Sequence, residues 1–305
     1  MKTFKESFRK KPLGKASSKA QSAMEYLMTY GWAILIISVV LAALFQLGVF
    51  NPMTFAPKAP PGSCQVFRPN GPGTTSFINL EGICSGELPQ YVAQFNGNGE
   101  IIANVNGLPI LAQPRTVTAW FNGNNYANGG GGNIFAYGAR VDYCYSWFSS
   151  DVGQYNDQLE VNTACSNQAF PPLLSAGQWY FVAFEYNGSA QIGYFEYGGT
   201  LYKVSAAFTA NTVSSQFNIG YGFDPPGYWS GLISNVQLYN TSLSANEIQA
   251  LYQEGIGGAP IDLQHLVAWW PLNGNANDYS GNGNNGQIIG NVNFVSNWYS
   301  GYTPP

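Results

Sequence analysis

Charged side chains are scarce in this sequence, and their distribution excludes some functions. Asp, Glu, Lys and Arg make up only 9% of the 305 residues. Seven of the 12 Lys and Arg residues and one of the 16 acidic residues, Glu6, lie within the first 20 positions. The rest of the chain therefore carries 5 basic residues and 15 acidic ones. A body with a net charge of about −10 has no basic face to neutralise a phosphate backbone, which argues against nucleic-acid binding.

Histidine is nearly absent too, and so are catalytic patterns of carboxylates. The single His265 would have to serve alone in any Ser-His-Asp or Cys-His arrangement, and it directly precedes a run typical of a strand. Glycosidases built on β-sandwiches place two or three acids in alternation on one strand face. No Glu-x-Asp-x-Glu run occurs here, and a predicted turn separates Glu185 from Glu196. The sequence therefore predicts that the protein is not an enzyme.

Cysteine is limited to four residues, which fall into two pairs with about 20 positions between the members of each pair. None of them has CxxC spacing and His265 is remote, so zinc or thiol-redox chemistry fits poorly. We expect two disulfides, Cys64 with Cys84 and Cys144 with Cys165, formed in an oxidising compartment. Four buried free thiols are the alternative.

A long apolar run is present near the N-terminus. No residue from Tyr26 to Phe50 is charged, and a helix over this run would span a hydrocarbon core of ~30 Å at ~1.5 Å per residue. An ordinary secretory signal would be shorter and end in small residues. Because the basic residues precede the run, we expect residues 1–20 in the cytoplasm and the chain after Asn51 outside, as in a single-pass protein of the cell membrane.

The residues just before this run are Lys19-Ala20-Gln21-Ser22-Ala23-Met24-Glu25-Tyr26. They resemble the archaeal class III signal peptide of type IV pilin-like proteins. The resemblance implies cleavage between Ala20 and Gln21, which makes Glu25 the fifth residue of the mature chain. It also implies that Glu25 pairs with the new amine of Gln21 in a neighbouring subunit of a filament. The alternative is a membrane anchor whose Glu25 lies at the headgroup level.

Prolines mark the end of the apolar run. Pro52, Pro57, Pro60 and Pro61 prevent the helix from continuing and favour an extended spacer. We predict a cleaved basic leader (1–20), a transmembrane or pilin-like helix (21–50), a Pro-rich linker (51–62), a disulfide-containing segment (63–90), a β-sandwich (91–255) and a tail (256–305).

The body of the chain consists of short alternating runs separated by Gly and Asn. Such runs cover residues 116–121, 179–186, 191–197 and 232–239, and hairpin signals lie at 186–189 and 196–199. These features predict a β-sandwich with jelly-roll connections. One short helix is expected after Ser244, because Ser244 and Glu247 form a capping-box pattern and Gly255 supplies a stop.

Residues 177–188, Gly-Gln-Trp-Tyr-Phe-Val-Ala-Phe-Glu-Tyr-Asn-Gly, resemble a strand pair of laminin G-like (concanavalin A-like lectin) domains. Residues 219–221, 231–240 and 243–248 resemble the closing strand and terminal helix of that family. The resemblance covers about residues 91–295, and it implies an all-β jelly-roll sandwich with a lectin-like function.

The tail departs from the order of that family. Residues 266–274 and 277–286 resemble its opening strand and loop, although they follow the closing helix. At roughly 40 residues, the tail is too short to bury a core of its own. We interpret it as a permuted strand that completes the same sandwich, and a truncated second repeat is the alternative.

The same resemblance implies a structural Ca²⁺ beside the loop that begins at Asp278. Asp278 matches the first expected ligand, but the closing strand has Ser234-Asn235 where two acids are usual, which removes negative charge from the site. The alternative is a calcium-free turn in which Asp278 caps backbone amides.

Glycan binding requires exposed aromatic faces beside amide and carboxylate groups. The candidates lie in segments rich in Asn, Gly and Pro, and they are Tyr145, Trp147, Tyr221, Tyr228 and Trp229. A sandwich core could claim any of them instead. Asn187 and Asn240 begin N-glycosylation sequons, which are compatible with export.

Together these features predict a membrane-anchored or pilus-assembled cell-surface protein that presents a lectin-like domain to glycans or surface proteins. Its other expected partners are the lipid bilayer and like subunits. One alternative is a carbohydrate-active hydrolase, which would place paired carboxylates about 5–10 Å apart on a concave sheet face. Another is an inert outer decoration of a filament.

Overall fold

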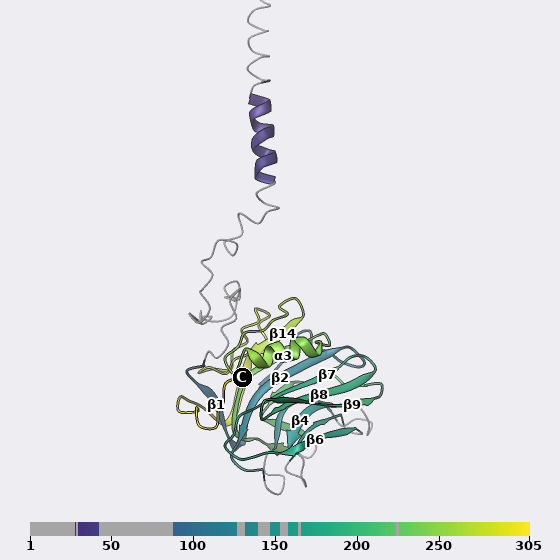
Figure 1. Ribbon diagram of the computed structural model, residues 1–305, viewed down its shortest axis with the longest axis vertical. Coiled ribbons are helices and arrows are strands. Elements are labelled where there is room, and N and C mark those ends of the chain that lie inside the picture. Colours follow the sequence, from purple (N-terminus) through teal and green to yellow (C-terminus); the bar gives the residue numbers. More distant parts are fainter. Residues whose placement is uncertain are drawn as a thin grey trace, which may run out of the picture. The chain divides into compact units, whose positions relative to one another are not determined.

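The computed structural model describes residues 28, 30–42, 88–126, 132–139, 147–152, 158–163, 166–223 and 226–305 (Figure 1). Backbone contacts divide the chain into two compact units, Met1–Pro57 and Lys58–Pro305. Residues 30–42 of the first unit are helical. Within the described residues, no helix combines the length and the apolar character needed to cross a bilayer.

Several predictions concern residues outside this description. The processing site at Ala20, Gln21 and Glu25 and the linker 51–62 lie there, as do all but the end of segment 63–90 and most of the predicted membrane span. The four cysteines lie there too, namely Cys64, Cys84, Cys144 and Cys165.

In its described residues the second unit is an all-β sandwich with one helix, as the sequence predicts. Its elements are β1 (Val92–Ala103), β2 (Arg115–Gly123), β3 (Asn133–Gly138), β4 (Trp147–Val152), β5 (Gln158–Asn162), β6 (Asn167–Leu173), β7 (Tyr180–Tyr186), β8 (Ala190–Tyr197), β9 (Thr200–Ala207), β10 (Phe217–Ile219), β11 (Tyr221–Phe223), β12 (Pro226–Tyr228), β13 (Ser230–Tyr239), α3 (Ala245–Gln253), β14 (Leu266–Trp270) and β15 (Gly286–Val295).

Two antiparallel layers share the long strand β1. One layer has the order β1-β13-β2-β7-β8-β9 and the other has the order β6-β5-β4-β3-β10-β1. Residues 93–96 of β1 pair with β13, and residues 101–103 pair with β10. Between these two stretches β1 is irregular, as the register shift of its ladder with β15 between Phe95 and Gly99 shows. This irregularity lets one strand leave the first layer and enter the second.

The main core fills the space between the layers. Alternate residues of each strand point into it, including Val117 and Phe121 of β2 and Val161 of β5. Phe148 of β4 stacks on Phe184 of β7 with ring centroids 3.7 Å apart and planes at 7°. Because β4 and β7 belong to different layers, this contact ties the layers together. Such aromatic pairs add about 0.5–1.5 kcal/mol beyond the burial of their area.

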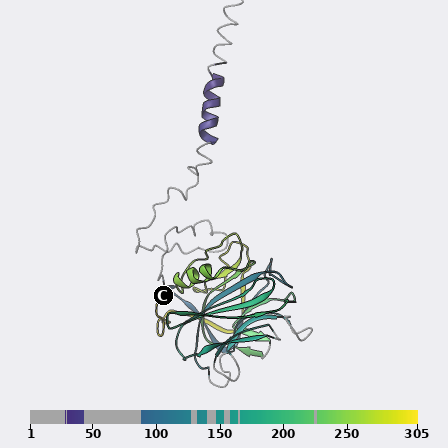
Figure 2. The ribbon, with the colours of Figure 1, turned by 45° about the vertical axis from the view of Figure 1, so that its right-hand side comes forward.

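Helix α3 covers the outer face of the first layer (Figures 1 and 2). Trp120 of β2 and Phe181 of β7 point away from the main core, and both contact the ring of Tyr252 at 5.9 Å. The helix begins with the predicted capping box: Ser244 Oγ accepts from the backbone N–H of Glu247, whose carboxylate accepts from the N–H of Ser244. Because both of their faces are covered, β2 and β7 are buried along their whole length.

The tail contributes two strands to the same sheet. β14 pairs with β13, and β15 pairs with β1 from Val92 to Ala103. Trp270 of β14 stacks on Phe217 of the opposite layer with centroids 5.1 Å apart. The tail therefore takes part in the sandwich rather than forming a separate body.

Candidate functional site

Two of the predicted ligand-binding aromatics meet on the small hairpin β11–β12. Tyr221 and Tyr228 are opposite each other in its register, and their ring centroids lie 4.6 Å apart at an interplanar angle of 38°. Tyr228 is 42% exposed. Gly220 adopts φ +80°, and a Cβ there would lie 2.4 Å from the ring of Phe95, so only glycine fits the bend from β10 into the hairpin. The hairpin thus presents a small aromatic platform.

The prediction of Trp229 as a ligand contact is wrong. Its side chain is fully buried, and its ring packs against Phe121 at 5.7 Å and Tyr126 at 6.3 Å. Successive residues of an extended chain point to opposite sides, so the exposure of Tyr228 directs Trp229 into the core. Tyr145 lies outside the described residues, and Trp147 starts β4 with a side chain that is not described.

A row of polar residues lies beside this platform, on the face of the second layer that points away from the core. Phe148, Val161 and Phe217 point inward, so their strand neighbours point outward. The strand register places these outward residues next to one another. We call this set the polar face, and it consists of Glu100, Ser149, Asp151, Glu160, Asn162 and Asn218.

Hydrogen bonds order only part of the polar face. Asn218 Nδ2 donates to Glu100 Oε2 at 3.0 Å, and Asn167 Nδ2 donates to Glu160 Oε2 at 3.3 Å. Asn218 Oδ1 and Ser149 Oγ have no hydrogen-bond partner among the described residues, although these side chains are only 4% and 2% exposed. A buried polar group without a partner costs about 1–3 kcal/mol, so these two atoms are open to a hydrogen bond from a bound molecule or an ordered water.

Burial also changes the acids of the polar face. It raises the pKa of Glu100 and of Glu160, and the hydrogen bonds from Asn218 and Asn167 oppose that rise. Burial, then Tyr228 and then Glu100 raise the pKa of Tyr221, so the Glu100 charge is felt at the aromatic platform. Asp151 and Glu160 are direct cross-strand partners on β4 and β5. Aromatic, amide and carboxylate groups therefore gather in one region.

The loop that begins at Asp278 is a closed turn. Asp278 Oδ1 accepts from the N–H groups of Trp269 at 2.9 Å and Ser280 at 2.8 Å. Asp278 Oδ2 accepts from Ser280 Oγ and from the N–H of Asn284, both at 2.8 Å. The side chain is fully buried. These bonds are those expected of a residue that caps backbone amides.

The same residues do not fit a Ca²⁺ ion. Calcium takes six to eight oxygen ligands, whereas both Asp278 oxygens already face hydrogen-bond donors. Asn235 Oδ1 is occupied as well, since it accepts from Trp269 Nε1 at 2.8 Å and Gln237 Nε2 at 3.0 Å. In the described parts of the chain, no group of three His, Cys, Asp or Glu side chains could hold a metal.

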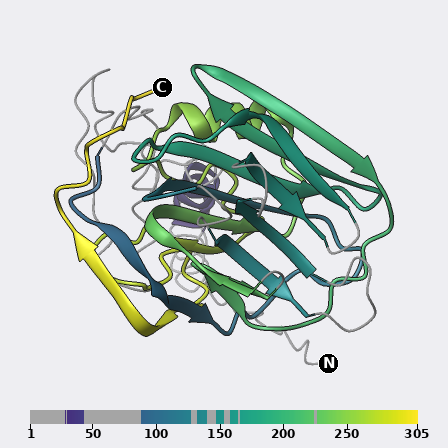
Figure 3. The same ribbon diagram turned by 90° about the horizontal axis from the view of Figure 1, so that it is seen from below.

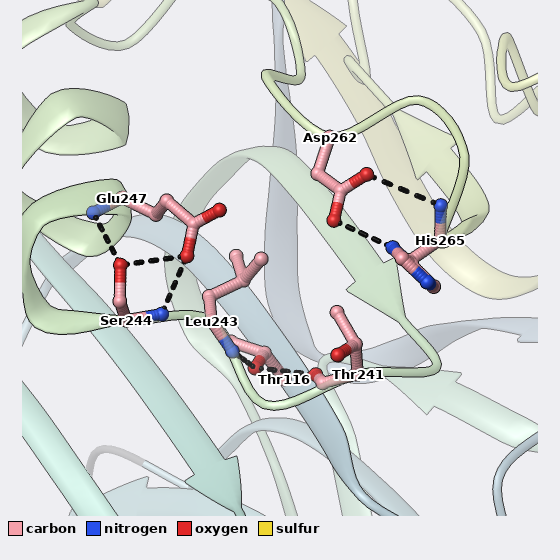
Figure 4. A network of polar contacts seen from close by, with 7 residues as sticks. All are labelled: Thr116, Thr241, Leu243, Ser244, Glu247, Asp262 and His265. Carbon is pink, nitrogen blue, oxygen red and sulfur yellow. Dashed lines mark hydrogen bonds and ion pairs between the residues drawn. The ribbon is translucent and has the colours of Figure 1, made fainter.

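The single histidine belongs to a structural network (Figure 4). His265 Nδ1 lies 2.8 Å from Asp262 Oδ2, and Ser244 Oγ bonds Glu247. Thr116 Oγ1 donates to the carbonyl of Thr241 at 2.9 Å and accepts from the N–H of Leu243 at 3.0 Å. The two bonds of Thr116 fasten the connection between β13 and α3 to β2, and the His265–Asp262 pair lies in the loop before β14.

Both predicted glycosylation sites lie at exposed strand ends. Asn187 occupies the β7–β8 turn, where its Oδ1 accepts from Ser189 N–H, Ser189 Oγ and Ala190 N–H at 2.9–3.0 Å. Asn240 follows β13, and Ser242 of its sequon donates to Glu185. Their modification stays a prediction.

Glu185 and Glu196 lie on the face of the first layer that α3 covers, away from the polar face. Both are largely buried, and Glu196 accepts from the N–H of Gly199 at 2.6 Å. Burial raises the pKa of Glu185, with Ser242 and Lys203 opposing that rise. As the sequence predicts, the turn between β7 and β8 separates Glu185 from Glu196 along the chain.

One similar solved structure supports this fold. A candidate carbohydrate-binding protein from Bacteroides ovatus is 17% identical with a TM-score of 0.51, and the match covers 68% of this chain and 60% of that protein. This chain therefore spans less than two thirds of the length of that protein. A pentraxin from Limulus polyphemus is 16% identical with a TM-score of 0.45, and the match covers 70% of this chain and 98% of the pentraxin.

Domain 4 of an arabinanase from Geobacillus stearothermophilus, solved with arabinotriose, is 18% identical with a TM-score of 0.38, over 53% of this chain and 80% of that domain. No curated protein matches the chain. The family model described as the concanavalin A-like lectin/glucanases superfamily matches residues 95–249, which is more than half of the 305 residues. The protein therefore belongs to the concanavalin A-like lectin/glucanases superfamily.

Proposed function

We propose that this protein is a glycan-binding protein of the cell surface, and that the sugar binds at the polar face and the Tyr221–Tyr228 platform. The observation that carries the proposal is the pair of buried polar groups, Asn218 Oδ1 and Ser149 Oγ, which have no partner among the described residues. Sugar hydroxyls donate and accept hydrogen bonds, so they suit such groups. The exposed ring of Tyr228 supplies an apolar surface for the face of a sugar ring.

A glycan array tests this function. The unit Lys58–Pro305 contains every residue of both core clusters, so it is the fragment to use. We expect specific signals, and about tenfold weaker binding for Tyr228→Ala. Tyr299→Ala is the matched control, because Tyr299 is 51% exposed and lies outside the site. A blank array would instead favour an inert decoration, and equal losses in both variants would contradict the assigned site.

A hydrolase at the same place is the second candidate, and one observation favours it. Asp151 and Glu160 are direct cross-strand neighbours, for which Cβ atoms lie about 4.5–5.5 Å apart. Retaining glycosidases hold their two carboxyl groups about 5–5.5 Å apart, a separation that side chains on neighbouring strands can reach, and their acid needs a raised pKa such as that of Glu160. Release of reducing sugar from polysaccharides that stops in Glu160→Gln would establish this activity. Binding without release would leave the protein a lectin.

The N-terminal sequence supports a membrane tether with type IV pilin-like processing of the archaeal class III kind. Seven basic residues precede an uncharged apolar run, and Gln21 and Glu25 occupy the positions that such processing requires. The β domain would then lie outside the cell, either on an anchored monomer or on a filament. N-terminal sequencing of the mature chain from membranes is expected to begin at Gln21. Any other start would count against pilin-type processing, and recovery in the cytosol would rule out the tether.

A further inference from the structure

Strand β15 forms an edge of the sandwich. Among the described strands it pairs with β1 alone, from Val92–Val295 at one end to Ala103–Gly286 at the other. Figure 3 shows it (yellow) at the periphery, alongside β1 (dark blue). The side of β15 that faces away from β1 therefore presents backbone N–H and C=O groups that can pair with another strand.

This edge lacks the proline and the charge that commonly block pairing, although a bulge interrupts the β1–β15 ladder between Phe95 and Gly99 and Gly290 of β15 adopts φ +71°. Residues 287–291 are all exposed, and they include Ile288 at 40% and Ile289 at 42%. The edge strand β6 contains Pro171 and Pro172, and the edge strand β9 contains Lys203. Proline and lysine are common means of preventing contact between edges. β15 has no proline and no charge over its whole length.

The charge around β15 indicates which partner fits. No Asp, Glu, Lys or Arg follows Asp278, whereas the body of the chain carries an excess of acids. Two copies of this acidic body repel one another over most of their surface. β15 itself is uncharged, and its partner strand β1 carries one acid, Glu100, opposite Ile289, so two copies can approach with less repulsion at this edge. A basic partner would find no opposite charge on this strand.

The side chains of β15 are also self-complementary. Gln287, Asn291 and Asn293 carry amides, and each amide both donates and accepts hydrogen bonds. Such amides already pair here, since Asn96 Nδ2 and Asn293 Nδ2 both donate to Asn291 Oδ1. The same amides can pair with their copies across an antiparallel two-fold axis.

We propose that β15 is a self-association strand. It pairs in antiparallel orientation with β15 of a second copy, so that the sheets of two domains continue through the contact and Ile288 and Ile289 become buried. The contact is isologous, because the same strand serves on both sides. This inference does not rest on glycan binding, although Ile289 lies opposite Glu100 of the polar face in the β1–β15 ladder.

Sedimentation velocity of the unit Lys58–Pro305 over a concentration series tests the proposal. We expect a reversible dimer, and Ile289→Lys should raise its dissociation constant at least about tenfold, since each copy loses one isoleucine from the contact and gains a charge that the paired edge must desolvate. The matched control is Ile261→Lys, because Ile261 is 38% exposed and lies outside every strand. The control should dimerise as the unaltered protein does.

Amide hydrogen exchange provides a second readout that requires no substitution. Backbone amides of residues 287–291 should become protected as the concentration rises through the dissociation constant, while those of the β9 edge should not change. A monomer throughout the series would overturn the proposal, and so would a dimer that Ile289→Lys leaves intact. Melting curves of both variants establish that they are folded.

Discussion

Arg115 is a buried cation whose replacement tests how the domain tolerates a charge in its core. The guanidinium is fully buried at the start of β2, and no carboxylate pairs with it in the described part of the chain. Its Nη1 donates to the carbonyl of Pro109 and the hydroxyl of Tyr137, both at 3.1 Å, and its Nη2 donates to the carbonyl of Leu111. Arg115 therefore fastens the loop before β2 to the core.

Two aromatic faces complete this environment. The guanidinium carbon lies 5.4 Å from the ring centre of Phe148 and 5.1 Å from that of Tyr186. Arg115→Met keeps most of the apolar volume but removes three hydrogen bonds of about 1.5–3 kcal/mol each and two cation–π contacts of about 0.5–2 kcal/mol each. Removal of the buried charge offsets several kcal/mol of this loss, because the desolvation cost of the guanidinium disappears. We expect a net loss of about 2–4 kcal/mol in the free energy of unfolding.

Urea unfolding of the unit Lys58–Pro305, followed by tryptophan fluorescence, measures this loss as a shift in midpoint at constant slope. Arg115→Lys is the informative companion, because it keeps a cation but not the planar fork that reaches two carbonyls, and it should also destabilise the domain. If Arg115→Met proves as stable as the unaltered domain, the hydrogen bonds of the guanidinium do no more than offset its burial, and the reasoning fails.

Three further predictions concern other parts of the domain. Trp298→Ala should cost about 3–5 kcal/mol in urea unfolding, because Trp298 is buried against Trp179 and donates to the carbonyl of Pro89. Asp278→Ala should lower the melting temperature, while calcium or a chelator added to the unaltered domain should not shift it, since hydrogen-bond donors occupy both carboxylate oxygens. Because the pKa values of Glu100 and Glu160 are raised, these two side chains hold protons more tightly in the folded state than in the unfolded state. Their protonation therefore stabilises the fold fully below the unfolded pKa near 4.5, and this stabilisation is lost as the pH rises through the folded pKa values. The melting temperature should therefore fall as the pH rises above about 4.5, and Glu160→Gln should make that fall smaller.

Local patterns in the sequence were sufficient to predict many of the elements. The run 116–121 lies in β2, the run 179–186 in β7 and the run 232–239 in β13. The capping box at Ser244 starts α3 where expected, and glycines with positive φ form the turns at 188 and 198–199. Each of these features depends on neighbours a few positions apart, which is why the sequence alone could reveal it.

The polar face could not be found in this way. Alternation in Gln158-Leu-Glu-Val-Asn162 does indicate a strand with one polar side. It does not indicate that Asn218 and Glu100, which are far away in the sequence, occupy the same face. Their proximity depends on the strand order β4-β3-β10-β1, and that order follows from the packing of the whole core.

The interpretation of Trp229 failed for a related reason. Tyr228 and Trp229 are adjacent, so an extended backbone exposes one of these two candidates and buries the other. The larger apolar side chain lies inside, where it contacts the rings of Phe121 and Tyr126. The alternation of an extended strand indicates that only one of Tyr228 and Trp229 can be exposed to a ligand. The packing of the core determines that this residue is Tyr228.

The tail links the fold to the proposed self-association. The family match ends at residue 249, so β14 and β15 lie beyond it, yet both strands belong to the same sheet as β1 and β13. β14 brings Trp270 into the core, whereas β15 adds one outer strand beside β1 and leaves its isoleucines exposed. A strand that served only to cover β1 would gain from a charge or a proline on its outer side. Because β15 has neither, its exposed edge is better explained by a strand that a second copy covers.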